Sequence, residues 1–245
     1  MIISDIRKSA RESLKGKWKT AILITLLYTA FSFSLSFMGN FLKGLNSLIG
    51  VATAIISLPI SFGIIISFMK LKRNEDVKVY DFFTLGLSNF ARVWKITGNM
   101  LLKMWLPILL YILATIAFVF CVSFGTMYLF AAKSATLISI LSFVGIALFI
   151  ASFIYLFVTS IKYSLSYFIA YDNESLTPKE VVESSDSLIK GYKGKYILLE
   201  LSFIGWGILS IFTFYIGLLW LIPYIQISEI CFYEYLKENK DSEIK

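Results

Sequence analysis

Two glutamates interrupt the last long apolar stretch of the chain, where paired carboxyl groups could handle a proton or a cation. Glu200 follows Lys195 by about one helical turn, and Glu229 lies about two turns before the stretch ends. On antiparallel helices, a rise of about 1.5 Å per residue places these carboxyl groups roughly 7 Å and 10 Å in from the same side. Charged groups at that depth are costly and usually face protein or water. The sequence therefore predicts an intramembrane polar site, whose candidate members are Glu200, Glu229, Lys103 and Lys162.

This candidate site has a functional and a structural interpretation, and the sequence leaves both open. The functional one is a site that handles protons or cations, or that contacts a lipid head group. The structural one is an ion pair with Lys103 or Lys162, or hydrogen bonds to nearby tyrosines. Glutamates close to an interface can extend toward water, which favours the structural interpretation.

The residue inventory excludes most other chemistry. The 245 residues include no histidine, so Ser-His-Asp and Cys-His catalysis and the commonest metal ligand are ruled out. Cys121 and Cys231 lie in apolar runs with no CxxC partner, and the glycines form no Walker A or GxGxxG motif. We therefore expect a protein that is not an enzyme and that uses no cofactor and no metal.

Three tyrosines recur at intervals of four residues just before a short polar segment. Tyr163, Tyr167 and Tyr171 are predicted to form an interfacial aromatic belt at the level of the lipid head groups, with ligand stacking as the alternative. Asp172 and Glu174 follow, and their spacing matches no EF-hand. They are expected to be solvated loop residues.

The elements that position these residues are predicted to be membrane helices. The chain is 58% hydrophobic and only 16% charged, with a mean hydropathy of +0.76. Such a chain cannot cover its surface with polar groups, which excludes a water-soluble domain. Five charge-free runs each exceed the roughly 20 residues that cross a bilayer, and they are 20–42, 44–69, 104–132, 134–161 and 201–228.

The last apolar block is too long for one span. It runs over 196–236, which would make about 60 Å of helix against roughly 30 Å of hydrocarbon. The segment 213–217, with aromatic and β-branched residues and one glycine, is predicted to be a tight turn between two spans. The total is then six transmembrane helices, and three prolines are expected to kink them, namely Pro59, Pro107 and Pro223.

The positive charge orients the predicted spans. With six spans both termini lie on one side, and of the 23 lysines and arginines only Lys43 and Lys133 then fall on the other side. Cytoplasmic loops carry such an excess, so a multi-pass protein of the cell membrane with cytoplasmic N- and C-termini is predicted. This asymmetry explains the net charge of +7 without nucleic acid as a partner.

Each pair of spans is predicted to follow an amphipathic surface helix. Apolar residues recur at helical spacing over 3–14, opposite basic residues, and a capping box at Thr177 and Glu180 begins a second such helix. A less regular one is expected over 80–91. The fold class is therefore all-α, a bundle of three transmembrane hairpins in a single domain (1–245), with repeat-like units over roughly 1–76, 77–172 and 173–241.

Several segments carry a resemblance to a known family. "SARESLKGKW", "SLIKGYKGKYILLELSFIGWGIL" and "GLLWLIPY" with its following "FYEYLK" resemble the bacterial membrane-protein family called domain of unknown function 975. The resemblance covers nearly the whole chain, although "WLPILLY" lacks the glycine expected after its proline. The chain is more distantly similar to the membrane domain of some glycerophosphodiester phosphodiesterases. The family implies a polytopic bacterial membrane protein and supplies no activity or site residues.

Three functions remain in view. The leading hypothesis is an accessory or interaction factor whose basic cytoplasmic face and surface helices engage membrane lipid, mainly anionic, or a protein partner or a second copy. The second is a small transporter or lipid-translocating protein that uses Glu200 and Glu229. The third is an immunity or receptor protein for a membrane-active peptide.

Overall fold

The computed structural model describes residues 3–41, 46–129 and 135–243, and all regular structure in these ranges is helical. The predicted all-α class is therefore confirmed. In chain order the helices are α1 (Ile3–Leu14), α2 (Trp18–Phe41), α3 (Asn46–Lys72), α4 (Asp81–Ser88), α5 (Phe90–Lys103), α6 (Trp105–Leu129), α7 (Ala135–Ile161), α8 (Ser166–Asp172), α9 (Pro178–Ile189), α10 (Lys193–Phe212) and α11 (Leu218–Glu243).

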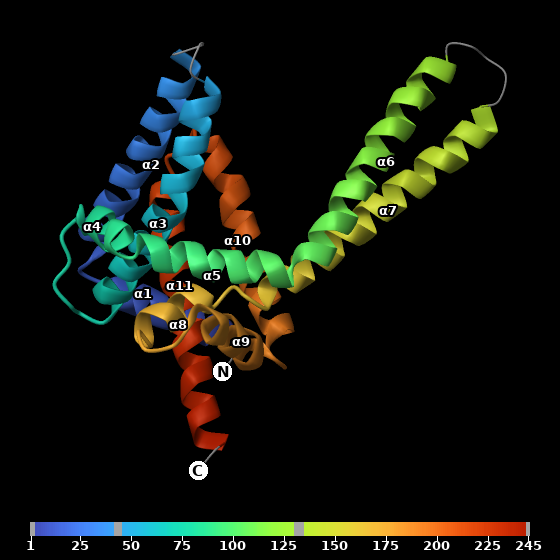
Figure 1. The fold of residues 1–245 in the computed structure, drawn as a ribbon. Coiled ribbons are helices and arrows are strands. Elements are labelled where there is room, and N and C mark those ends of the chain that lie inside the picture. The colour runs from blue at the N-terminus through green and yellow to red at the C-terminus, as the bar shows by residue number, and fades with distance from the viewer. Residues whose placement is uncertain (1–2, 42–45, 130–134, 244–245) are drawn as a thin grey trace. The chain divides into compact units, whose positions relative to one another are not determined.

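The chain divides into two compact units. Unit 1 comprises residues 1–97 and 165–245, and unit 2 comprises residues 98–164. Within unit 1, α11 is the central helix, and α1, α2, α3, α9 and α10 all lie against it (Figure 1). Its buried side chains include Ile227, Ile230, Phe232 and Leu236.

The first helix buries its apolar stripe inside unit 1. Ile6, Ala10 and Leu14 are each at most 2% exposed, and α1 lies against α11 and α10. The apolar face from which the sequence predicted a membrane-surface helix is thus covered by protein. Whether α1 also lies on a membrane surface stays a prediction.

Two glycines bring α3 and α4 into backbone contact. A Cβ on Gly63 would overlap the carbonyl oxygen of Phe82, and one on Gly86 would overlap that of Pro59. Phe82 is fully buried and packs edge-on against Tyr28 of α2, with ring centroids 6.3 Å apart. The short α4 is therefore held to the α2–α3 pair by close packing.

Five segments of the described chain are long and apolar enough to cross a membrane. They are Trp18–Leu35, Gly50–Lys72, Trp105–Ser123, Ser142–Asp172 and Lys193–Phe212. The last helix, α11, is not among them, because Gln226, Glu229 and several tyrosines lower its hydropathy. Neighbouring helices surround α11, so polar residues on it need not meet lipid.

The predicted break in the last apolar block is present. The helix α10 ends at Phe212 and α11 begins at Leu218. The side chain of Thr213 closes the turn, since its hydroxyl donates to the Ser210 carbonyl (2.9 Å) and accepts from the Gly217 amide (2.9 Å). The two helices form consecutive antiparallel elements of unit 1 (Figure 1).

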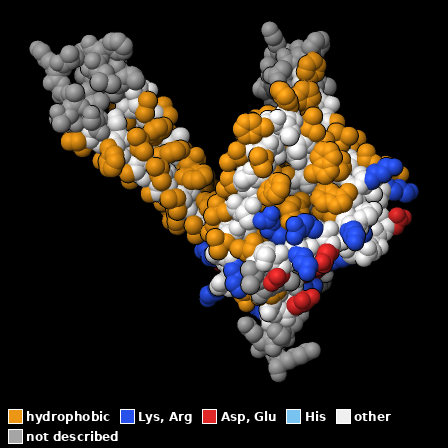
Figure 2. All heavy atoms as spheres, turned by 180° about the vertical axis from the view of Figure 1, so that it is seen from behind, with side chains coloured by type: hydrophobic (Ala, Val, Ile, Leu, Met, Phe, Trp, Pro, Cys, Tyr) orange, Lys and Arg blue, Asp and Glu red, His pale blue; other side chains and the backbone are white. Residues whose placement is uncertain are grey.

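Unit 2 is a hairpin of α6 and α7 that buries little. Its helices meet through aromatic rings, with Phe118 stacked on Phe149 at 5.1 Å and Tyr111 at 5.6 Å from the same ring. Side chains such as Ile116 (61% exposed) and Phe143 (73%) point away from the pair. Figure 2 shows hydrophobic side chains covering this hairpin, a surface suited to lipid.

The predicted repeat remains a prediction. In chain order a short helix precedes each pair of long helices, as the predicted units 1–76, 77–172 and 173–241 require. This order alone does not establish a repeat within one domain.

Candidate functional site

The two glutamates predicted from the sequence lie next to each other in unit 1. Glu200 lies on α10 and Glu229 on the adjacent α11, and the two carboxyl groups are close enough to interact electrostatically. Glu229 accepts hydrogen bonds from the Tyr196 hydroxyl (3.1 Å) and from Nε2 of Gln226 (3.2 Å). A tyrosine partner matches the structural interpretation of the pair.

Two buried oxygen atoms at this site accept no hydrogen bond from the described residues. Within the described ranges, Oε1 of Glu200 and Oε1 of Gln226 are buried without a hydrogen-bond partner. An unsatisfied buried polar atom costs about 1–3 kcal/mol. The site therefore presents oxygen atoms to which a proton donor or a cation can bind.

The two lysines grouped with these glutamates belong to unit 2. Lys103 is the last residue of α5, and Lys162 directly follows α7. Their pairing with Glu200 or Glu229 stays a prediction.

The three interfacial tyrosines do not share one continuous helix, because α7 ends at Ile161 and α8 begins at Ser166. Tyr167 shares a hydrogen bond of 2.8 Å with Thr97 and packs edge-on against Phe62. Tyr171 lies 6.0 Å from the Arg73 guanidinium, and Tyr163, in unit 2, is 8% exposed. At least two of them thus contact protein groups, and a head-group belt stays a prediction.

The prolines fall at two kinds of position. Pro59 and Pro223 lie in the interiors of α3 and α11, as expected for kinks. Pro107 instead is the third residue of α6, in a first turn whose N–H groups have no helical partner. Whether Pro107 bends that span stays a prediction.

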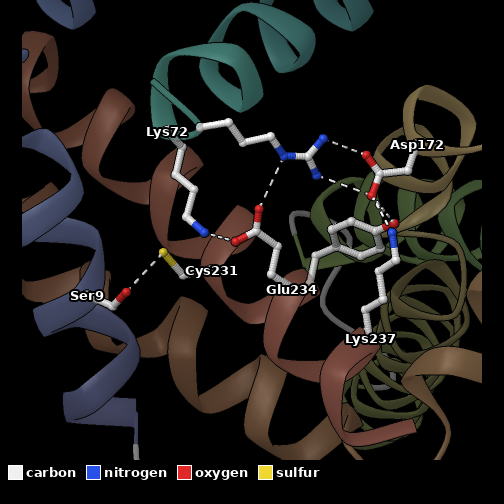
Figure 3. Close-up of polar contacts among 8 residues, drawn as sticks. Ser9, Lys72, Asp172, Cys231, Glu234 and Lys237 are labelled. Carbon is white, nitrogen blue, oxygen red and sulfur yellow. Dashed lines mark hydrogen bonds and ion pairs between the residues drawn. The ribbon is translucent and has the colours of Figure 1, made fainter. Parts of the chain in front are cut away.

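A cluster that the sequence did not predict lies where α3, α8 and α11 meet. Asp172, expected to be solvated, has a side chain only 5% exposed. Its carboxylate accepts two hydrogen bonds from Arg73 (2.7 and 3.2 Å), one from Lys237 (2.9 Å) and one from the Tyr233 hydroxyl (3.0 Å) (Figure 3). The side chain is therefore an anchor between three helices.

A second carboxylate extends the cluster. Glu234 pairs with Lys72 and, at 3.4 Å, with Nε of Arg73 (Figure 3). The hydrogen bonds that Arg73 donates to Asp172 raise the pKa of Arg73, which therefore stays charged. We call the six residues the polar clasp, and they are Lys72, Arg73, Asp172, Tyr233, Glu234 and Lys237.

The clasp escaped prediction because its members are far apart in the sequence. Arg73 and Asp172 are 99 positions apart, and Asp172 and Lys237 are 65 apart. The sequence does place Arg73, whose guanidinium can bind a carboxylate through two hydrogen bonds, directly after one apolar run. It places Asp172 directly after a tyrosine-rich segment. Two such residues at the same side of a membrane are candidates for an ion pair.

The described residues contain no group of three or more histidine, cysteine or acidic side chains that could hold a metal ion. Cys231 is buried, with its sulfur 3.7 Å from the Ser9 hydroxyl (Figure 3). This contact joins α1 to α11.

Comparison with known proteins gives one match. The model of the family described as "Protein of unknown function (DUF975)" matches residues 1–240. No curated protein and no solved structure matches the chain. The more distant resemblance to the membrane domain of glycerophosphodiester phosphodiesterases stays a prediction.

Proposed function

We propose, from the premise that this chain belongs to the DUF975 family, that it is a six-span accessory protein of the cell membrane that engages anionic lipid at its cytoplasmic face. Five helices that can span a membrane support the multi-pass part, and α11 is the sixth span of the proposal. The protein carries out no catalysis in this proposal, and a protein partner is the competing occupant of the same face.

The positions of the basic residues support the orientation. Lys17, just before α2, donates to the carbonyl of Leu71 near the end of α3 at 2.6 Å, so these two helix ends lie together. Burial lowers the pKa of Lys17, with the positive charge of Lys72 as the second cause. Lysines also mark the start of α10 and the end of α11, at Lys193 and Lys237. In α10 and α11, these basic ends lie opposite the turn at residues 213–217.

The single observation that carries the function is a basic helix held firmly against this end. Packing against α11 fixes the apolar face of α1. Lys8 on α1, Lys15 directly after it and Lys19 at the start of α2 are exposed. Basic residues near an anionic surface contribute about 1 kcal/mol each. Figure 2 shows charged side chains gathered beside the hydrophobic surface of unit 1.

The test replaces charge without removing α1, because truncation would unpack α11. The triple variant Lys8→Gln, Lys15→Gln, Lys19→Gln should lose most of its preference for spin-labelled phosphatidylglycerol over phosphatidylcholine in reconstituted vesicles. The double variant Lys43→Gln, Lys133→Gln is the control for the opposite face. Equal lipid preference in the triple variant and the wild type would contradict the proposal.

The orientation has its own test. In a background carrying Cys121→Ala and Cys231→Ala, a membrane-impermeant thiol reagent applied outside should label Asn46→Cys and spare Ser242→Cys. Labelling of Ser242→Cys, or none of Asn46→Cys, would exclude six spans with cytoplasmic termini.

The unused oxygens of the glutamate pair favour a second candidate, a small transporter. Glu200→Gln and Glu229→Gln should then abolish proton or cation flux in proteoliposomes while the melting temperature is kept. If the variants kept the flux of the wild type, or if the wild type showed no flux, the pair would be only a structural contact between α10 and α11.

A further inference from the structure

A groove of about 450 Å³ opens in unit 1 between α10 and α11 and reaches α1 and the start of α2. This volume lies within the roughly 300–1,000 Å³ of small-molecule sites. It is separate from the glutamate pair, because neither Glu200 nor Glu229 lines it.

Most of the groove wall is hydrocarbon. Trp18, Trp206 and Trp220 line it, and the last two are 55% and 48% exposed. Trp206 lies 11 residues after Lys195, roughly 16 Å along α10, which is near the middle of a bilayer if α10 spans it. An acyl chain is the apolar ligand that a membrane offers at that depth.

One end of the groove is basic. The guanidinium of Arg7 lies 5.3 Å from the Phe203 ring centroid, and its Nε donates to the Tyr224 hydroxyl at 3.2 Å. These contacts fix the guanidinium, while within the described chain Nη1 and Nη2 have no acceptor. Arg11, one helical turn further on, is exposed and lines the same groove.

The two arginines select the charge of the ligand. Guanidinium groups bind phosphate through paired, charge-assisted hydrogen bonds. Among the described residues that line the groove, none is acidic and could compete for them. A free phosphate ion would satisfy the arginines and leave the tryptophan walls unused, whereas a phospholipid uses both.

We infer that this groove binds one anionic phospholipid, with its phosphate on Arg7 and Arg11 and an acyl chain between Trp206 and Trp220. The inference rests on the proposed engagement of anionic lipid and names a single bound molecule within it. The lysines Lys8, Lys15 and Lys19, which attract anionic lipid in general, do not line this groove.

The test is native mass spectrometry of the full chain, purified in mild detergent and titrated with phosphatidylglycerol or phosphatidylcholine. The wild type should bind one phosphatidylglycerol and bind phosphatidylcholine at least about tenfold more weakly. Arg11→Gln, which removes no described contact, should weaken phosphatidylglycerol binding by about tenfold, and Arg11→Lys should recover part of it. Leu209→Trp, which fills the groove, should abolish binding of both lipids.

Three results would overturn the inference. The first is equal binding of the two lipids, and the second is no effect of Arg11→Gln. The third is a wild-type dimer that Leu209→Trp dissociates, because the groove would then bind a second copy of the chain. The triple lysine variant separates this inference from the proposed function, because it should keep the single bound lipid while it loses the general lipid preference.

Discussion

The two units of this protein differ in how much of their apolar surface they bury. Unit 1 buries its core around α11 and anchors one end with the polar clasp. Unit 2 leaves large side chains such as Ile116 and Phe143 pointing outward along its hairpin. The difference shows that apolar residues have two roles here: in unit 1 they build a core as well as an exposed apolar surface, and in unit 2 most of them form such a surface, which is suited to lipid or a partner.

The largest effect is expected in unit 1, where backbones touch. Gly63→Ala should destabilise the protein by more than about 3 kcal/mol, the upper end of ordinary overpacking, because the new methyl group overlaps the Phe82 carbonyl. The matched control is Gly205→Ala, where an added Cβ meets nothing within 4 Å. The control should gain about 0.5–1 kcal/mol from helix propensity. Thermal melting in detergent, followed by tryptophan fluorescence, measures both, and a stable Gly63→Ala protein would show that α3 and α4 are not in backbone contact.

The next effect tests whether unit 2 faces lipid. Ile116→Arg places a charge on the outward face of α6 and should cost about 2.5–3.5 kcal/mol of insertion free energy. Glycosylation mapping of the α6–α7 hairpin should then report reduced insertion. Ser175→Arg, at an exposed position between α8 and α9, should insert as the wild type does. Normal insertion of Ile116→Arg would mean that protein or water covers this face.

A smaller loss is expected at the polar clasp. Asp172→Asn removes the charge that Arg73 and Lys237 share, and breaking a buried pair costs about 3–5 kcal/mol. Because both basic partners are partly exposed, we expect about 2 kcal/mol in the same melting experiment. Glu174→Gln, on the exposed neighbour, should have no effect. Equal melting of the two variants would show that the clasp adds no stability.

The smallest effect concerns the capping box of α9. The Thr177 hydroxyl accepts from the Glu180 amide (3.3 Å), and Thr177→Ala should cost about 1 kcal/mol. Hydrogen bonds from Thr177 lower the pKa of Glu180, so its contribution is present above the unfolded carboxyl pKa and is lost as the pH falls through the folded value. The difference in melting temperature between wild type and Thr177→Ala should therefore shrink at acid pH. If this difference in melting temperature did not change with pH, the Glu180 carboxylate would not contribute to the stability of the cap.

Local patterns in the sequence predicted the local structure. The capping box at Thr177 and Glu180, and the turn at residues 213–217, follow from residue type and spacing over a few positions. The helical class follows from apolar runs of membrane length.

The sequence failed where a residue's environment depends on distant segments. Asp172 is followed by Asn173 and Glu174, a polar segment typical of a solvated loop. Only the fold brings it to Arg73 and Lys237. The stripe on α1 is visible in the sequence, yet nothing there distinguishes a lipid surface from α11 as its cover. The groove likewise combines α1 with α10 and α11, which lie at opposite ends of the chain.

The polar clasp also constrains the order of biogenesis. A ribosome that has just completed Asp172 must add 65 more residues before Lys237 exists, which takes roughly 3–13 s at ordinary translation rates. During that interval the early helices are already made while the central helix of unit 1 is missing. Unit 1 can therefore close only after α11 has been synthesised.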